Sequence, residues 1–493
     1  MSKTSRLAGR GALANALLTG VSTLVVAGSA AGAAVLLAHE FGRDARTDGF
    51  FAAYGVYLVL SIAAQAFRLV VAPELAGAAQ QGRLGEEARA WLAAFLVLAV
   101  AGTVAAVALA GPIGDALTGN ATAAAVAEQA VRWLVPAALA QLLAAIAASA
   151  LAAQDDYATA ALAYALGAAS SLVVFAALTS YGVVALAWGT AVNGAVTLAI
   201  PLAALARRGL LLGPLRAAQL ALPHRLWRLV EGAAVPLAVQ GLFVVANRSV
   251  AALGEGRQTS FSYAYLIAAM LVTVTASTIS LISAVPLTRR GIDDGVAARH
   301  VVDATWLSLA LIAGAAGAIS LVGGDVFQHV LGSAYEGGVG REIGRLVLEL
   351  APWTVTAVVY TLGFPLLFVA GRRRLLLPLA VGAVALHVPV VLGLRAGLHL
   401  PGVALSLAVS TLALVAGLLW ALSPRLLAGV ARGIVRPVAL EAGAASLCFG
   451  VLALLVGHWA AALGGLVLYA GALAGLWRWG LGAAWRYVRA LHD

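Results

Sequence analysis

Long apolar runs recur along the whole chain, and they constrain its fold more than any other feature. A helix needs about 20 consecutive apolar residues to cross a bilayer, and runs of this length occur fourteen times. The sequence therefore predicts fourteen transmembrane helices with both ends of the chain on one side of the membrane. Their approximate bounds are 12–38, 49–75, 90–112, 129–153, 156–178, 182–206, 229–253, 261–287, 304–323, 345–370, 375–395, 400–422, 437–456 and 459–484.

Composition supports the same class. Hydrophobic residues make up 62% of the chain and charged residues 11%, whereas folded soluble domains carry about 25% charge. The predicted fold class is an all-α polytopic membrane protein. The single cysteine, Cys448, excludes a disulfide within the chain and any cysteine-rich metal site.

The basic residues predict the orientation. Most of the 31 lysines and arginines lie at the two termini or in loops that the span plan places on the same side as the termini. Because such residues concentrate in cytoplasmic loops, both termini are predicted to lie in the cytoplasm. The net charge of +10 is explained in this way, and nucleic acid is not an expected partner. The basic, then apolar N-terminus resembles a signal peptide, but its apolar run is too long for one, so we expect a retained first helix.

Two sequence similarities between distant spans indicate an internal duplication. The segments Arg46–Gly82 and Ser262–Gly291 each carry a long span that ends in a proline, Pro73 and Pro286 respectively. The start of span 6 also resembles the start of span 12, at nearly the same offset. Parallel repeats of this kind are a transporter architecture with the substrate site between the halves. The predicted domains are an N-terminal six-helix lobe, a basic cytoplasmic linker, a C-terminal six-helix lobe and two additional helices, at 1–208, 209–228, 229–424 and 425–493.

Polar residues inside the apolar spans are the candidate site residues. A charge at the bilayer centre costs about 2.5–3.5 kcal/mol on insertion scales, so it normally faces a cavity or a partner. For Glu231, Gln240 and Asn247, the polar residues of span 7 (229–253), two interpretations remain open. They make helix–helix hydrogen bonds, or they form the wall of a water-filled cavity. Arg132 is interpreted as an interfacial anchor. The substrate-binding candidates are Arg68, Arg248, Asn247, Gln240, Glu231 and Asp48.

Other isolated polar residues are interpreted as structural. The Asp155-Asp156 pair is expected in a tight turn between spans 4 and 5, where it caps the helix rather than binding a metal. No phosphate-binding loop, HExxH or GxSxG motif, or Cys-His metal spacing occurs. We therefore expect a transporter rather than an enzyme, with no cofactor. The remaining residues interpreted as structural are Asn193, Glu349, His387 and Glu441.

Several segments resemble the MurJ/MviN lipid II flippases of the multidrug/oligosaccharidyl-lipid/polysaccharide (MOP) exporter superfamily. They are the stretch Thr47–Tyr54, the Val71–Leu75 exit of span 2 and the plan of twelve plus two spans. The resemblance implies two six-helix lobes in a V, a cationic central cavity and a groove for a polyprenyl tail at spans 13 and 14. The implied cargo is an undecaprenyl-diphosphate-linked saccharide that crosses the bacterial plasma (inner) membrane to the outer leaflet.

The chain departs from this family at the arginines of the cationic cavity, which the resemblance implies in spans 1, 2 and 8. Span 1 has no arginine after Arg10, the middle of span 2 reads Leu60-Ser61-Ile62, and span 8 carries none at the family position. Arg68 and Arg248 are hypothesised to supply replacement charge, because arginine matches phosphate oxygens.

Two other classes of function stay open. One is a sodium- or proton-coupled exporter of multidrug-type cations from the same superfamily, which would use acidic residues such as Asp48, Glu231 and Glu349. The other is a non-transporting scaffold for envelope assembly, for which substituting Arg68 or Arg248 would leave function intact. The sequence predicts neither the sugar, the coupling ion nor the oligomeric state.

Overall fold

The computed structural model is helical throughout its described residues, which are 3–213, 221–277, 279–280, 293–336, 338–369 and 373–490. No strand occurs in these ranges, so the predicted all-α polytopic class is confirmed. The chain divides into two compact units, Met1–Val244 and Val245–Asp493. The predicted domain bounds and the predicted duplication stay predictions, and residues 281–292, which include Pro286, lie outside the described residues.

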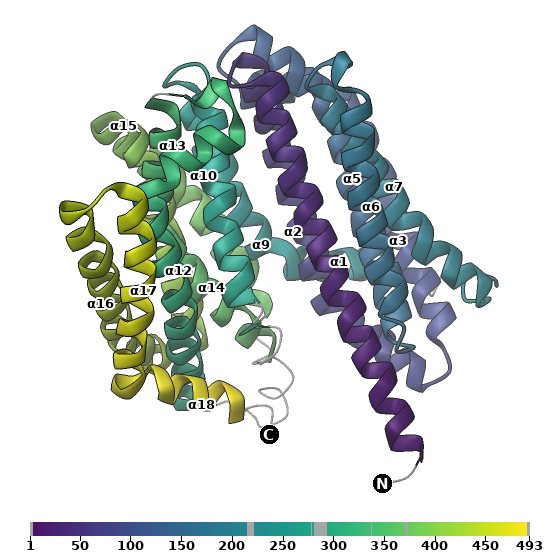
Figure 1. Cartoon of the computed structure of the whole chain (residues 1–493). Helices are drawn as coiled ribbons and strands as arrows, with labels where there is room; N and C mark the ends of the chain where they lie inside the picture. The colour runs from purple at the N-terminus through teal and green to yellow at the C-terminus, as the bar shows by residue number, and fades with distance from the viewer. Residues whose placement is uncertain are drawn as a thin grey trace. The chain divides into compact units, whose positions relative to one another are not determined.

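In its described residues, the first unit contains α1 to α7 and most of α9 (Figure 1). α9 begins at Leu222, inside the segment predicted as a linker, and continues into the second unit. The helices are α1 (Lys3–Phe41), α2 (Ala45–Gln80), α3 (Leu84–Ala108), α4 (Ala110–Leu117), α5 (Ala121–Ala152), α6 (Ala158–Ala177), α7 (Val184–Arg207) and α9 (Leu222–Ala251), with a 3-10 turn at Thr179–Tyr181.

Side-chain caps begin α2 and α5, where the sequence supplies a short polar residue. Asp44 caps α2, because its Oδ1 accepts from the backbone N–H of Thr47 at 2.9 Å while the Thr47 hydroxyl accepts from the Asp44 N–H at 2.9 Å. Asn120 caps α5 by accepting from the Ala123 N–H at 2.8 Å. These reciprocal bonds satisfy backbone donors that have no partner inside the helix.

α5 forms the core of the first unit. It packs against α2, α3, α4 and α7, and its buried residues are mostly alanines. Small residues let helix backbones approach closely inside a membrane. At Gly194 of α7, an added Cβ would lie 2.7 Å from the carbonyl oxygen of Ala137 in α5. At Gly49 of α2, an added Cβ would collide with the Ala123 backbone. Both contacts therefore require glycine.

The second unit is arranged around α12. This helix packs against α13, α14, α16 and α17 (Figure 1). One apolar cluster joins Val301 of α12 to Val430 of α16, and a second joins Trp306 of α12 to Leu476 of α17. The helices are α10 (Arg257–Val272), α12 (Asp294–Leu331), α13 (Gly338–Glu349), α14 (Ala351–Val369), α15 (Leu376–Leu422), α16 (Pro424–Leu455), α17 (His458–Leu476) and α18 (Gly482–Ala490), with π turns at Thr273–Ser277 and Trp477–Leu481 and 3-10 turns at Ser333–Tyr335 and Arg373–Leu375.

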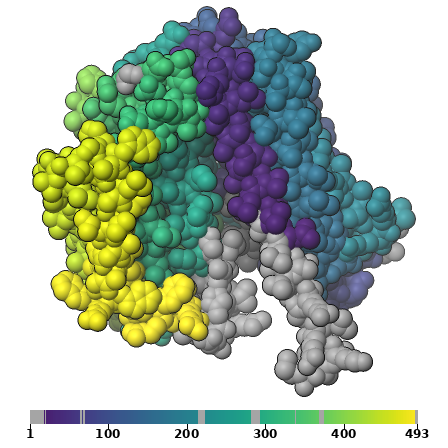
Figure 2. All heavy atoms as spheres, in the orientation of Figure 1, coloured from purple at the N-terminus to yellow at the C-terminus, as the bar shows by residue number. Residues whose placement is uncertain are grey.

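The predicted spans fall on helices in the described part of the chain, and the end of the span 261–287 lies outside it. Among the described residues, eleven helices are long and apolar enough to cross a membrane, or twelve if α13 and α14, bent by 46°, form one span. α2 holds a further predicted span, and α15 holds two that meet at His399, where φ is 55°. Apolar side chains from Leu447 to Trp485 lie exposed on α16–α18, the yellow surface in Figure 2. Such a surface suits contact with lipid.

Several elements differ from the predicted bounds. α16 begins at Pro424 rather than at 437, because Ser423 caps it and proline suits the first turn of a helix. α12 extends beyond the predicted 304–323 at both ends, and Asp293 caps it by accepting from the Val296 N–H at 2.7 Å. The predicted span near 345–370 is broken at Leu350, between α13 and α14.

Candidate functional site

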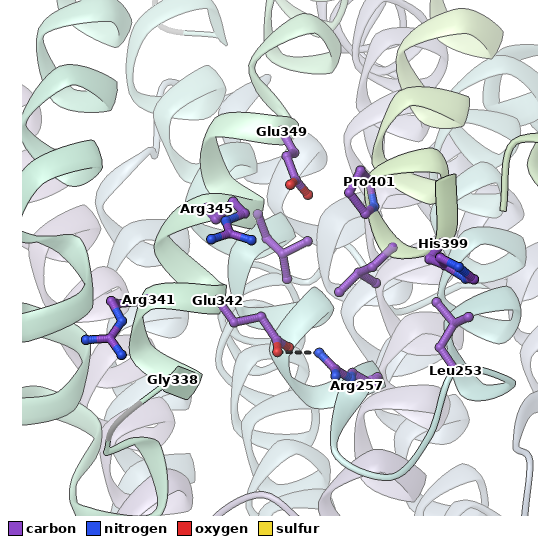
Figure 3. Close-up of a pocket in the computed structure, with 11 residues that line it drawn as sticks. Leu253, Arg257, Gly338, Arg341, Glu342, Arg345, Glu349, His399 and Pro401 are labelled. Atoms are coloured by element: carbon purple, nitrogen blue, oxygen red, sulfur yellow. Dashed lines mark hydrogen bonds and ion pairs between the residues drawn. The ribbon is translucent and has the colours of Figure 1, made fainter. Parts of the chain in front are cut away.

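An open pocket of about 520 Å³ lies in the second unit (Figure 3). Three segments far apart in sequence line it, namely the turn from α9 to α10, the polar face of α13 and the turn inside α15. The lining residues are Leu253, Arg257, Gly338, Arg341, Glu342, Arg345, Leu346, Glu349, His399, Leu400 and Pro401.

The sequence of α13 explains its polar face. Ile343, Leu346 and Val347 are buried, while Arg341, Arg345 and Glu349 follow one another at intervals of four residues. Residues four apart lie on the same side of a helix. The apolar side of α13 therefore packs into the unit, and its charged side faces the pocket.

The pocket carries charges of both signs. Arg257, at the start of α10, forms an ion pair with Glu342 of α13, drawn as the dashed line in Figure 3. The side chain of Glu349 points toward the α15 turn, whereas Arg341 points away from the other labelled residues (Figure 3). Three arginines against two glutamates leave one net positive charge, apart from His399. Arginine provides a planar set of donors that fits phosphate or carboxylate oxygens, so the site can hold a polar head group with an anionic part.

The two substrate-binding candidates of the second unit, Asn247 and Arg248, do not line this pocket. The predicted span plan places Arg257, Arg341 and Arg345 in or next to loops on the side opposite the termini, and Glu349 is interpreted from the sequence as structural. The sequence did contain a signal for this site, because Arg341, Arg345 and Glu349 are spaced four residues apart and so share one side of a helix. The sequence could not bring these residues to Arg257 and His399, because that depends on how α13 packs against two distant turns.

The polar residues of α9 are divided between the two units. Asn247 is 2% exposed and belongs to the second unit, where its Oδ1 accepts from the Ser262 hydroxyl at 3.4 Å. Its backbone carbonyl accepts from Gln258 Nε2 at 3.1 Å. Asn247 therefore makes helix–helix hydrogen bonds with α10, the first of the two alternatives left open for span 7. The half-buried Arg248 follows it in the same unit.

The remaining candidates lie in the first unit. Glu231 is half-buried and accepts from the indole N–H of Trp227 at 2.8 Å. Gln240 is half-buried, and Asp48 is buried in the first turn of α2. Arg68 lies within α2, but its side chain is outside the described residues. Its assignment as a substrate-binding residue stays a prediction, as do those of the other five.

The isolated polar residues have defined partners. Arg132 pairs with Glu128 one turn away on α5. His387 Nδ1 and the Ser410 hydroxyl lie 2.9 Å apart, joining the two halves of α15. Glu441 is hydrogen-bonded to residues of α12 and α17. Within the described residues, no group of three or more His, Cys, Asp or Glu side chains is placed to hold a metal ion.

Known structures share this fold. No protein-family model matches the sequence, and neither does any curated protein. Among solved structures, the chain is similar to the lipid II flippase MurJ in an inward closed conformation, with a TM-score of 0.74 and 14% identity over 94% of this chain and 99% of that one. It is also similar to an inward-facing multidrug resistance MATE family transporter of the MOP superfamily, with a TM-score of 0.58 and 17% identity over 83% of this chain and 99% of that one.

A eukaryotic MATE transporter has a TM-score of 0.53 and 13% identity over 86% of this chain and 95% of its own. The chain therefore shares the fold of these membrane proteins. The resemblance noted in the sequence is confirmed at the level of fold.

Proposed function

We propose that the chain is a flippase that moves an undecaprenyl-diphosphate-linked saccharide, either a peptidoglycan precursor or an oligosaccharide, to the outer leaflet of the bacterial plasma membrane. The observation that carries this proposal is the near full-length likeness to the lipid II flippase. It covers 94% of this chain, against 83% for the inward-facing MATE transporter. The family layout has twelve spans followed by two more, and α16 and α17 lie where these last two spans are predicted.

The distribution of arginine supports an anionic cargo. A diphosphate would need cationic donors along its path, and guanidinium groups bind phosphate oxygens bidentately. Arg248 is half-buried near the end of α9, and Arg257 and Arg345 line the pocket. With both termini in the cytoplasm, the charge asymmetry assigns this pocket to the external side. In our account it receives the head group as the cargo leaves.

A second candidate is an ion-coupled exporter of organic cations. The MATE likeness favours it, and so do the two carboxylates of the pocket, Glu342 and Glu349. The two candidates differ in the charge of the cargo, so ligand charge separates them.

Native mass spectrometry of the full chain in detergent tests the proposal. Undecaprenyl diphosphate is expected to bind more tightly than undecaprenyl monophosphate, and a lipophilic cation such as ethidium is expected not to compete. Arg248→Ala should weaken diphosphate binding by about tenfold, the scale of one charged hydrogen bond. Arg132→Ala is the matched control, because Arg132 is exposed and paired with Glu128. Preferential binding of ethidium, lost on Glu349→Gln, would favour the exporter instead.

A further inference from the structure

Glu441 is a buried carboxyl group on a helix that otherwise exposes most of its apolar surface. α16 buries five residues, Leu426, Val430, Pro437, Glu441 and Phe449. They form one stripe along the helix, and Glu441 is 1% exposed in the middle of it. An ionisable group at such a position is costly in a membrane and calls for a functional explanation.

Three hydrogen bonds surround this carboxyl group. The indole N–H of Trp306 in α12 donates to Glu441 Oε1 at 3.0 Å. The hydroxyl oxygen of Tyr469 in α17 lies 2.5 Å from Glu441 Oε2 and 2.9 Å from the carbonyl oxygen of Ala310 in α12. Glu441 and Tyr469 thereby connect α16 and α17 to the central helix of the second unit.

The Tyr469 hydroxyl has one hydrogen and two acceptors within bonding distance. If Glu441 is ionised, the hydroxyl donates to the carboxylate and the bond to Ala310 is lost. If Glu441 is protonated, its O–H donates to Tyr469, and Tyr469 donates to Ala310. The protonated form therefore makes all three hydrogen bonds at once.

The cation nearest to Glu441 in sequence is Arg436 of α16. Its guanidinium carbon lies 6.0 Å from the centroid of the Trp306 ring, and its Nη2 donates to the Trp479 carbonyl at 2.8 Å. Within the described residues, Glu441 has no ion pair. Among the described residues, Tyr469 of α17 interacts electrostatically with Glu441 and with Cys448 of α16. Asp303 lies one turn before Trp306 in α12. A buried unpaired carboxylate is strongly disfavoured against its neutral form.

The helices around Glu441 are packed closely enough for a change in its protonation to affect their contact. An added Cβ on Gly314 of α12 would lie 3.0 Å from the Tyr469 ring. The Phe449 ring fills the space beside Gly317 of α12 and Gly465 of α17, where an added Cβ would collide with it. At Gly480, whose φ is 140°, the chain passes directly against the Trp306 ring before α18 begins. The hydrogen bonds of Glu441 thus lie at the contact of α12, α16 and α17.

We propose that Glu441 is a proton-binding site whose protonation holds α16 and α17 against α12. On release, the carboxyl O–H bond breaks, its electron pair stays on oxygen and the proton passes to water. Tyr469 keeps its proton and turns from Ala310 to the new carboxylate. The bond between α17 and the α12 backbone is lost, and the contact loosens. This site is independent of the nature of the cargo.

Infrared spectroscopy of the full chain in lipid nanodiscs tests the proposal. A protonated carboxylic acid absorbs apart from a carboxylate, and at pH 7 exposed Asp and Glu side chains are ionised. We expect one protonated-carboxyl band at pH 7 that is absent in Glu441→Gln and unchanged in Glu336→Gln, an exposed control. Tyr469→Phe should shift this band, because it removes the hydrogen-bond partner of the carboxyl. A spectrum without a band that depends on Glu441, at any pH at which the protein stays folded, would overturn the proposal.

Thermal unfolding gives a second measurement. Glutamine reproduces the bonding pattern of protonated glutamate, because its oxygen accepts from Trp306 and its amide donates to Tyr469. Glu441→Gln should therefore be at least as stable as the wild type at pH 6, because the unfolded wild type already ionises at this pH, and raising the pH further should destabilise the wild type relative to the variant. A large loss of stability in Glu441→Gln at pH 6 would mean that Glu441 is an ionised structural acceptor, which contradicts the proposal.

Discussion

The turn between α5 and α6 gives the clearest case of a single charged residue that stabilises the fold. Asp156 accepts from the Thr159 N–H at 3.0 Å and from its hydroxyl at 2.8 Å, and it pairs with Arg208. Partial burial opposes ionisation, but the Thr159 hydrogen bonds and the Arg208 charge together hold the pKa of Asp156 below its usual value. The capping role predicted for the Asp155-Asp156 pair therefore belongs to Asp156.

This geometry predicts a pH-dependent contribution to stability. A carboxyl with a lowered pKa in the folded state stabilises the protein above its unfolded pKa, and that stabilisation is lost as the pH falls through the folded value. Asp156→Asn should lower the melting temperature at pH 7, and the difference from wild type should shrink below about pH 4. Asp155→Asn, at the exposed neighbouring position, is the control and should change little. A difference that is constant from pH 7 to pH 3 would contradict the electrostatic explanation.

The close contact between α7 and α5 makes a second prediction at this scale. Gly194→Ala should destabilise the protein by about 1–3 kcal/mol, the usual cost of overpacking, because the new methyl group would meet the Ala137 carbonyl. Gly28→Ala in α1 is the matched control, since nothing lies within 4 Å of a Cβ added there. The control should be neutral or slightly stabilising, as alanine favours helix. Equal effects of both substitutions on thermal unfolding would refute the packing argument.

Individual site residues were harder to predict than the spans that carry them. Asn247 stood out in the sequence because it interrupts an apolar span, and it is buried as a helix–helix contact. Glu441 stood out for the same reason, but its partners Trp306 and Tyr469 are 135 and 28 residues away in sequence. Composition and spacing reveal that a polar residue lies within an apolar span, whereas its partner is set by tertiary packing.

Among the elements, α9 is anchored to the first unit by charged residues at its beginning. Arg225 is buried, its Nη1 lies 2.5 Å from Glu87 Oε1 of α3, and its guanidinium lies 4.7 Å from the Trp91 ring centroid. Arg228 pairs with Glu74 of α2. The sequence analysis assigned these arginines to a cytoplasmic linker, which accounts for their charge but not for these contacts.

Breaking this anchor should cost more than breaking an exposed ion pair. Arg225→Ala is expected to destabilise the protein by about 1.5–3 kcal/mol, the range for a hydrogen bond to a charged group. Arg132→Ala removes an exposed ion pair between residues one helical turn apart, and such a pair typically contributes about 0.3–0.5 kcal/mol. Chemical denaturation in detergent compares the two variants. A loss of stability in Arg225→Ala no larger than that in Arg132→Ala would contradict the anchoring role of Arg225.

The length of the apolar runs predicted the helices well because a bilayer fixes the length of a span. It also separated the two spans of α15 at the turn where His399 lies. It failed at Leu350, where a break separates the amphipathic α13 from α14. The pocket forms between these irregular places, so its residues could be found as charges in the sequence but not as one site.

For the whole molecule, the orientation in the membrane is open to a direct test. In a Cys448→Ser background, Glu255→Cys lies in the turn between α9 and α10, and Gln81→Cys lies in the turn between α2 and α3. The charge asymmetry predicts that a membrane-impermeant maleimide labels the first in intact cells and the second only after permeabilisation. The opposite pattern would invert the assignment and would move the pocket to the cytoplasmic side.

The central claim is that the chain flips a lipid-linked diphosphate. Its most direct test is flipping of fluorescent undecaprenyl-diphosphate lipids in proteoliposomes, with the native chain, Arg68→Ala, Arg248→Ala and the control Arg132→Ala. We predict flipping by the native chain and by Arg132→Ala, and at least a tenfold lower rate in Arg68→Ala or Arg248→Ala. Absence of flipping by the native chain, with both lipid II and simpler lipid-linked saccharides, would contradict the account.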